Sequence, residues 1–246
     1  MLPIRDENPI GITPILTIAA IIACVAVFLW QLGGSAEAQQ LKIYRFGLIP
    51  ASLTGAADLD PRLAVVPPWL TVVTSMFMHG GFMHLGGNML FLWIFGNNIE
   101  DRLGHGRFAL FYLASGLAAA AAQVALDPDS MVPMVGASGA ISGIMGAYMV
   151  LYPRAQVVTL IFLGFFVTTM RIRAIWYLGI WGLIQLVSTF FMQPGEGGVA
   201  FAAHLGGFVA GIGLIFLMSP PSAPRPPRVP RVPRRRVPRY RRGPWG

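Results

Sequence analysis

The chain has 246 residues, of which 55% are hydrophobic and 11% are charged, and its formal net charge is +8. A soluble domain usually carries about 25% charged residues, so this composition excludes an ordinary soluble domain and indicates a multi-span membrane protein. Cys24 is the only cysteine, which excludes an intrachain disulfide and a metal cluster held by several thiolates.

Six apolar segments approach the roughly 20 residues that a helix needs to cross a bilayer. They are 12–32, 83–99, 107–126, 134–152, 172–192 and 201–218. A further apolar stretch, 157–169, is short for a span, so we interpret it as an interfacial or re-entrant segment. The predicted fold class is therefore an all-α membrane protein built as a bundle of six transmembrane helices.

The distribution of basic residues predicts that both termini are cytoplasmic, by the positive-inside rule. The loops after the second and fourth segments carry Arg102, Arg107, Arg154, Arg171 and Arg173, whereas the loops 127–133 and 193–200 carry no basic residue. The long external loop, 33–82, has three basic residues, but two aspartates accompany them. We therefore expect a cytoplasmic N-terminus over 1–11, a six-span domain over 12–218 and a cytoplasmic tail over 219–246.

The tail is rich in proline and arginine and holds nine of the 18 basic residues. Arg225, Arg228, Arg231 and Arg234 recur every three residues, which is the repeat of a polyproline II helix. We expect a disordered tail held near anionic lipid, at about 1 kcal/mol for each basic residue close to the surface. A specific contact of the tail with a protein or a nucleic acid is the weaker alternative. No nucleic-acid partner is expected, because the positive-inside rule already explains the net charge.

Two polar features stand out within the apolar segments. The first is Ser138 in the sequence Gly136-Ala-Ser-Gly139, and the second is His204, followed by Gly207 and Gly211. A serine hydroxyl becomes a nucleophile when a base such as imidazole accepts its proton. At about 1.5 Å per helical residue, Ser138 would lie roughly 8 Å below the outer surface, at a depth similar to that of His204. Taken singly, each feature fits close helix packing or a structural hydrogen bond better than it fits catalysis.

His84 and Asn88 lie four residues apart, which places them on one face of a helix. Together with the Ser138 amide they could donate hydrogen bonds to a tetrahedral oxyanion, or they could form a polar clamp between helices. All ten acidic residues fall outside the six segments, so a Ser-His dyad is expected and a triad is not. No metal or cofactor is expected, and we interpret His79 as a structural hydrogen-bonding residue.

These motifs resemble those of the rhomboid family of intramembrane serine proteases. The matching residues are His79 to Asn88 with their His and Asn spacing, Glu100-Asp-Arg102-Leu-Gly104, Gly136-Ala-Ser138-Gly139 and Ala203-His204-Leu-Gly-Gly207-Phe-Val-Ala-Gly211. The resemblance covers about 70–218. It implies a six-helix rhomboid-like catalytic domain, membrane-protein substrates and a place in a bacterial inner membrane.

The resemblance also implies roles for individual residues. Ser138 would be the nucleophile and His204 the general base and acid, while His84, Asn88 and the Ser138 amide would form the oxyanion hole. Gly136, Gly139, Gly207 and Gly211 would support the site, and Glu100 would form an ion pair with Arg102. Ser142 departs from the family, because many relatives have there an aromatic residue that packs against the catalytic imidazole. Tyr148 and Phe201 are the candidates to replace it.

Two other functions fit parts of the sequence. A non-catalytic rhomboid-like protein would bind membrane-protein clients, although such relatives usually lack the serine or the histidine that this chain keeps. A small transporter or channel would be favoured by charged residues within the spans, and the sequence places none there.

Overall fold

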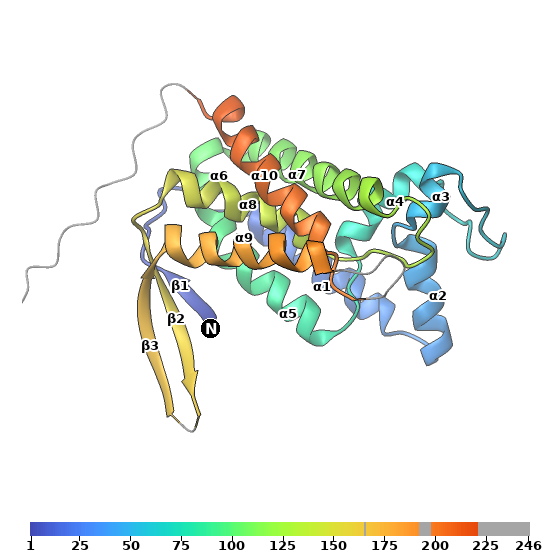
Figure 1. Ribbon diagram of the computed structural model, residues 1–246, viewed down its shortest axis with the longest axis horizontal. Coiled ribbons are helices and arrows are strands. Elements are labelled where there is room, and N and C mark those ends of the chain that lie inside the picture. Colours follow the sequence, from blue (N-terminus) through green and yellow to red (C-terminus); the bar gives the residue numbers. More distant parts are fainter. Residues whose placement is uncertain (165, 192–197, 221–246) are drawn as a thin grey trace, which may run out of the picture.

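The computed structural model describes residues 1–164, 166–191 and 198–220 (Figure 1). The helical elements are α1 (Ile15–Gln31), α2 (Ala36–Phe46), α3 (Pro50–Thr54), α4 (Pro68–Thr74), the 3-10 turn η1 (Ser75–Phe77), α5 (Phe82–Phe91), the π turn η2 (Leu92–Gly96), α6 (Asn97–Leu103), α7 (His105–Leu126), α8 (Ser138–Leu151), α9 (Ala174–Phe191) and α10 (Phe201–Met218). The strands are β1 (Leu2–Asp6), β2 (Gln156–Leu163) and β3 (Phe166–Arg173). The arginine-rich part of the predicted tail lies outside the described residues.

Each of the six predicted apolar segments is helical. The second is a composite of α5, η2 and α6, which follow one another without a break. Three helices, α7, α9 and α10, are long and apolar enough to cross a membrane, and α1 and α8 are shorter apolar helices. The chain is thus mostly helical, with three clear candidates for membrane spans.

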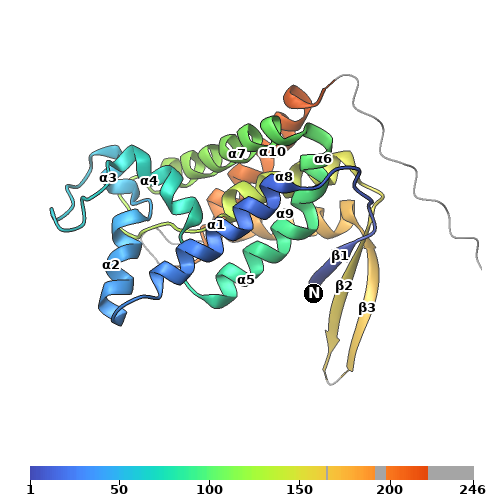
Figure 2. The same ribbon diagram turned by 180° about the vertical axis from the view of Figure 1, so that it is seen from behind.

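Helix α10 packs most extensively against α8 and α7, as both views of the ribbon show (Figures 1 and 2). A methyl group added at Gly211 would overlap the backbone carbonyl of Gly143, and one added at Gly207 would overlap that of Gly139. Only glycine permits this approach. The fourth and sixth apolar segments are therefore in close contact, and this packing brings the N-termini of α8 and α10 to the same end of the bundle. The glycine spacing predicts close helix packing but does not identify the partner of either helix.

The prediction of an all-α fold is wrong in one respect, because the chain contains an antiparallel sheet of order β1-β2-β3. The stretch 157–169 makes most of the hairpin β2–β3, with Val157 opposite Ile172 and Ile161 opposite Thr168. This hairpin projects away from the helices (Figures 1 and 2), and the interpretation of the stretch as interfacial or re-entrant stays a prediction. β-Branched and aromatic residues dominate both strands, and these residues favour extended backbone.

The predicted external loop 33–82 contains α2, α3 and α4. It is hydrogen-bonded to the segment that precedes α8. The backbones of Leu48 and Met134 exchange two hydrogen bonds, of 2.7 and 3.0 Å. Helix α8 then begins at Ser138, four residues later than the predicted span. The depth of roughly 8 Å, which assumed a helix over those residues, therefore does not hold.

Glu100 fastens α6 to the first turn of α1. Its side chain is fully buried, and its carboxylate accepts hydrogen bonds from the amides of Leu16 and Thr17, both at 2.8 Å, and from the Thr17 hydroxyl at 2.7 Å. His105 Nδ1 lies 2.6 Å from the same carboxylate. A negative charge beside unpaired amides at a helix N-terminus is stabilising. Its ion pair with Arg102 stays a prediction.

Candidate active site

A cavity of about 590 Å3 lies among α5, α7, α8, α9 and α10. Its lining includes the side chains of His84, Asn88, Ser138, Trp181 and His204. Four of these five residues are predicted site residues, and they come from three segments of the chain. The structure therefore gathers them around one space.

Ser138 and His204 are in direct contact although 66 residues separate them. Ser138 Oγ lies 2.8 Å from His204 Nε2, within hydrogen-bonding distance. Ser138 is the first residue of α8 and His204 lies in the first turn of α10. The glycine-mediated packing of these two helices, with their N-termini at the same end, brings the hydroxyl and the imidazole together.

Gln185 of α9 holds the other nitrogen of the imidazole. Gln185 Oε1 lies 2.8 Å from His204 Nδ1, and the glutamine is only 6% exposed. An amide oxygen can only accept, so Nδ1 carries the proton and Nε2 is left to accept from the serine hydroxyl. The motifs do not predict this contact. The available signal was that Gln185 is the single side-chain amide in the apolar segment 172–192.

The aromatic support of His204 comes from Trp181, whose ring centroid lies 5.9 Å from that of the imidazole. Tyr148, one of the two residues suggested for this role, packs instead on Phe95 and donates a 2.6 Å hydrogen bond to Asp6. Ser142 donates its hydroxyl to the Ser138 carbonyl at 2.6 Å, one turn back in α8. The missing aromatic residue at Ser142 is thus replaced from α9.

His84 and Asn88 both point at Gly136, two residues before Ser138. A methyl group added there would lie 2.7 Å from His84 Nε2 and 3.5 Å from Asn88 Nδ2. The Gly80 amide donates to His84 Nδ1 at 3.3 Å, so Nε2 of the neutral ring carries the proton and can donate. Asn88 Nδ2 is buried and has no hydrogen-bond partner among the described residues. Two donors therefore face the cavity beside Ser138.

Gly136 has a φ of +123°, a conformation that residues with a side chain rarely adopt. Its backbone amide donates to the Ser75 carbonyl at 2.9 Å, which fixes the turn into α8. The amide of Ser138 belongs to the first turn of α8, whose N–H groups have no partner within the helix. This amide is a third possible donor beside the serine hydroxyl.

His79 has a different environment from the other histidines. Its backbone amide donates to Gln31 Oε1 at 2.9 Å, and its carbonyl accepts from Gln31 Nε2 at 3.0 Å. These bonds tie the segment before α5 to α1, and the structural role of the His79 side chain stays a prediction. Among the residues that the structure describes, no group of three histidine, cysteine or acidic side chains could hold a metal ion.

Comparison with known families gives a match to the rhomboid domain over residues 67–221, which is more than half of the sequence. The chain belongs to the rhomboid family. It is a multi-pass membrane protein of that family, and the match covers α5 to α10 and all four motifs.

Individual rhomboid relatives are similar over parts of the chain. The rhomboid protease GluP of Bacillus subtilis is 41% identical over 81 residues, which are 33% of this chain and 15% of that protein. The mitochondrial rhomboid protein 1 of Saccharomyces cerevisiae is 33% identical over 38% of this chain and 28% of its own length. The RHOMBOID-like protein 5 of Arabidopsis thaliana is 28% identical over 66% of this chain and 48% of its own. The chain thus spans about half or less of the length of these relatives.

Proposed function

We propose that this rhomboid is an intramembrane serine endopeptidase, which hydrolyses peptide bonds in or near the transmembrane segments of membrane proteins. The observation that carries the proposal is the 2.8 Å contact between Ser138 Oγ and His204 Nε2 inside the cavity. The similarity to proteins named rhomboid proteases supports the same activity.

In the proposed reaction, His204 Nε2 accepts the Ser138 proton while Oγ attacks the carbonyl carbon of the peptide bond. The proton then passes from Nε2 to the leaving amine, and the carbon–nitrogen bond breaks to leave an ester on Ser138. Water, activated by the same nitrogen, hydrolyses the ester and restores the serine. Gln185 keeps the proton on Nδ1 throughout, so that Nε2 is available as the base.

The oxyanion of the tetrahedral intermediate would be stabilised by His84 Nε2, Asn88 Nδ2 and the Ser138 amide. Donors that are oriented before the reaction stabilise developing charge without a cost of reorganisation. The unpartnered Asn88 amide supports this role, because a buried donor without a partner is costly and needs an explanation.

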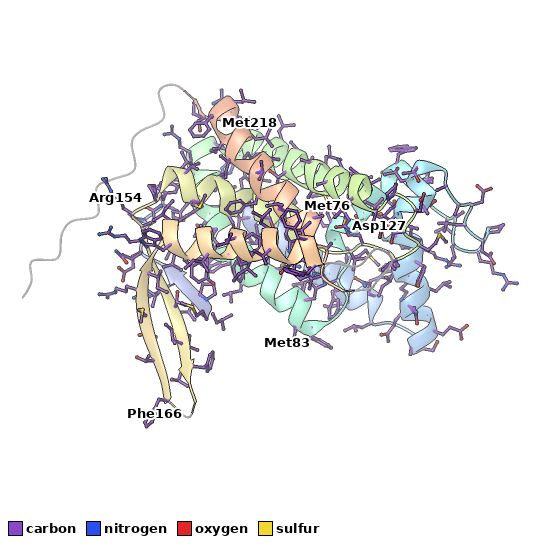
Figure 3. All side chains as sticks on the ribbon, viewed as in Figure 1. Met76, Met83, Asp127, Arg154, Phe166 and Met218 are labelled. Carbon is purple, nitrogen blue, oxygen red and sulfur yellow. The ribbon has the colours of Figure 1, made fainter. Side chains whose placement is uncertain are left out.

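The proposal includes the topology. Six helical segments would cross a bacterial inner membrane with both termini in the cytoplasm, so that the site opens to the outside. The N-termini of α8 and α10 lie at the same end of the bundle as loop 33–82. Arg154 lies near the base of the hairpin, at the opposite end from Asp127 (Figure 3). This separation agrees with the positive-inside rule. The tail 219–246 would follow α10 on the cytoplasmic side, near anionic lipid.

A substrate helix has to unwind before its backbone can reach Ser138, because helical hydrogen bonds shield the carbonyl groups. We therefore expect substrates with glycine, proline or polar residues in the outer half of the transmembrane segment. Replacing those residues with leucine should slow cleavage, and cleavage that is insensitive to the change would contradict the expectation.

The experiment is cleavage of a single-span reporter by purified protein in lipid nanodiscs. Ser138→Ala and His204→Ala should each abolish most of the activity, because the two groups act as a unit. Ser142→Ala is the matched control: it removes a hydroxyl one turn away in the same helix and should retain most of the activity. Undiminished cleavage by both dyad variants would refute the proposal, and a folded wild-type protein without activity would favour a non-catalytic client-binding role.

A further inference from the structure

The two faces of the hairpin β2–β3 differ in charge. Directly opposed residues of an antiparallel pair share a face, and residues adjacent along a strand alternate between faces. The register therefore defines one uncharged set, the apolar face, which includes Val157, Thr159, Ile161, Phe166, Thr168, Met170 and Ile172. The opposite face carries Arg171 and Arg173 near the base of the hairpin.

At its base, the apolar face is turned toward the helices. Val157 and Thr159 are fully buried, and Val157 belongs to the main hydrophobic core. Asp6, opposite Val157 in β1, accepts a hydrogen bond from the Tyr148 hydroxyl of α8. At its base, this face of the sheet therefore packs against the helices.

Toward the turn, the helices no longer cover the apolar face. Met170 is 52% exposed and Phe166 is 78% exposed. Figure 3 shows Phe166 at the far end of the hairpin, away from the helices, and the strands run across the direction of the long helices in Figures 1 and 2. The exposed part of the hairpin therefore lies to the side of the helices (Figures 1 and 3), in the space that lipid fills around a multi-pass membrane protein.

We propose that the hairpin is a lipid-binding element whose apolar face rests on the leaflet at the end of the bundle away from Ser138. The identity of that leaflet as the cytoplasmic one rests on the topology proposed above. In this arrangement, the lipid contact of the hairpin adjoins the lipid-facing surface of the helices at the edge of the bundle. Phe162 and Val167, on the opposite face beside the turn, are 58% and 57% exposed, so the tip is apolar on both sides and suited to enter the boundary between headgroups and acyl chains.

Charge complementarity supports the same partner. Arg171 and Arg173 are exposed, and they lie at the base of the hairpin, which would be at the membrane surface in the proposed topology. Arg171 Nε also lies 3.0 Å from Glu7 Oε1, so one acidic group offsets part of the charge. Basic residues at this level are attracted to anionic headgroups. The apolar face supplies the contact with acyl chains, and the arginines favour an anionic leaflet.

Two adjacent threonines of β3 allow a matched test. Thr168 lies on the apolar face and Thr169 on the opposite face, and both are exposed. In a Cys24→Ala background, Thr168→Cys and Thr169→Cys would each be labelled with the fluorophore bimane and placed in nanodiscs of phosphatidylcholine and phosphatidylglycerol. Brominated acyl chains should quench the label at 168 several-fold more strongly than the label at 169.

Equal quenching at the two positions, or none at either, would overturn the proposal. A label at 168 that is shielded from aqueous iodide but insensitive to brominated lipid would also overturn it, because a protein surface would then be the occupant. If Arg171 and Arg173 attract anionic headgroups, quenching of the label at 168 should be weaker in nanodiscs without phosphatidylglycerol. Reporter cleavage measured on unlabelled protein tests the protease proposal separately, since selective quenching does not depend on activity.

Discussion

Replacing Gln185 with leucine is the most informative single change to the proposed dyad. It removes the only acceptor that the structure shows for His204 Nδ1, at 2.8 Å, in an environment where the glutamine is 6% exposed. The imidazole then loses the contact that keeps its proton on Nδ1. The other tautomer, with the proton on Nε2, cannot accept a proton from Ser138.

The expected size of the effect follows from the lost hydrogen bond. A buried donor left without a partner costs about 1–3 kcal/mol. At 1.36 kcal/mol for each factor of ten, kcat should fall about 5- to 150-fold. This loss is smaller than that expected for Ser138→Ala, because the dyad contact itself remains possible in a fraction of the molecules.

The assay is steady-state cleavage of the reporter, with kcat and KM determined separately and thermal unfolding measured in parallel. Gln185→Leu should lower kcat with little change in KM, because the contact acts on proton transfer and not on substrate binding. Gln185→Glu keeps an oxygen acceptor of the same reach and should retain more activity than the leucine variant. Wild-type kcat in Gln185→Leu would refute the assigned role of Gln185.

Three further predictions concern the supporting structure. Gly136→Ala should lower the free energy of unfolding by about 1–3 kcal/mol and reduce kcat/KM at least about tenfold, because it strains a backbone with φ of +123° and crowds His84 Nε2. Gly211→Ala should also lower the unfolding temperature and the activity, because the new methyl group would overlap the Gly143 carbonyl and separate α10 from α8. Burial raises the pKa of Asp6 from 3.8 to about 6 despite its hydrogen bond from Tyr148, so Asp6 stabilises the fold below about pH 4 and this contribution is lost as the pH rises through about 6. The wild-type unfolding temperature should therefore fall over that range relative to Asp6→Asn.

Matched controls separate these effects from general damage. Gly86→Ala and Gly213→Ala add the same methyl group at helical glycines with open space around them, and both should behave like the wild type. If Gly213→Ala and Gly211→Ala destabilise the protein equally, close packing of α8 and α10 is not the cause. Parallel pH profiles for the wild type and Asp6→Asn would show that burial of Asp6 does not affect stability.

Much of the helical architecture could be predicted from the sequence, because long uncharged segments leave few alternatives. Close packing of the fourth and sixth segments was predictable for a further reason, although their pairing with each other was not: Gly139, Gly143, Gly207 and Gly211 recur at the spacing that lets two helix backbones touch. Once those backbones are in contact, Ser138 and His204 have to lie near one another. The contact between these two residues therefore follows from helix packing, and the glycine spacing within each segment is the sequence signal for that packing.

The hairpin and the partners of His204 were harder to predict, for physical reasons. A short apolar run such as 157–163 is compatible with a strand, a buried helix or a membrane-surface segment, and periodicity alone does not distinguish them. The enrichment in Val, Ile, Phe and Thr on both sides of Gly164 was the available signal for a hairpin. Gln185 and Trp181 belong to no motif, and their contacts with His204 depend on how α9 is rotated against α10, which a single sequence does not encode locally.

The most direct test of the central claim is mass-spectrometric detection of a fluorophosphonate adduct on Ser138 in the folded, nanodisc-embedded protein. The proposed dyad predicts that the wild type is modified at Ser138 and that His204→Ala, although folded, loses the modification, because the hydroxyl no longer has a base. Absence of the adduct in the wild type, or equal modification of Ser138 in the wild type and in His204→Ala, would contradict the claim that Ser138 and His204 act together as a nucleophile and its base.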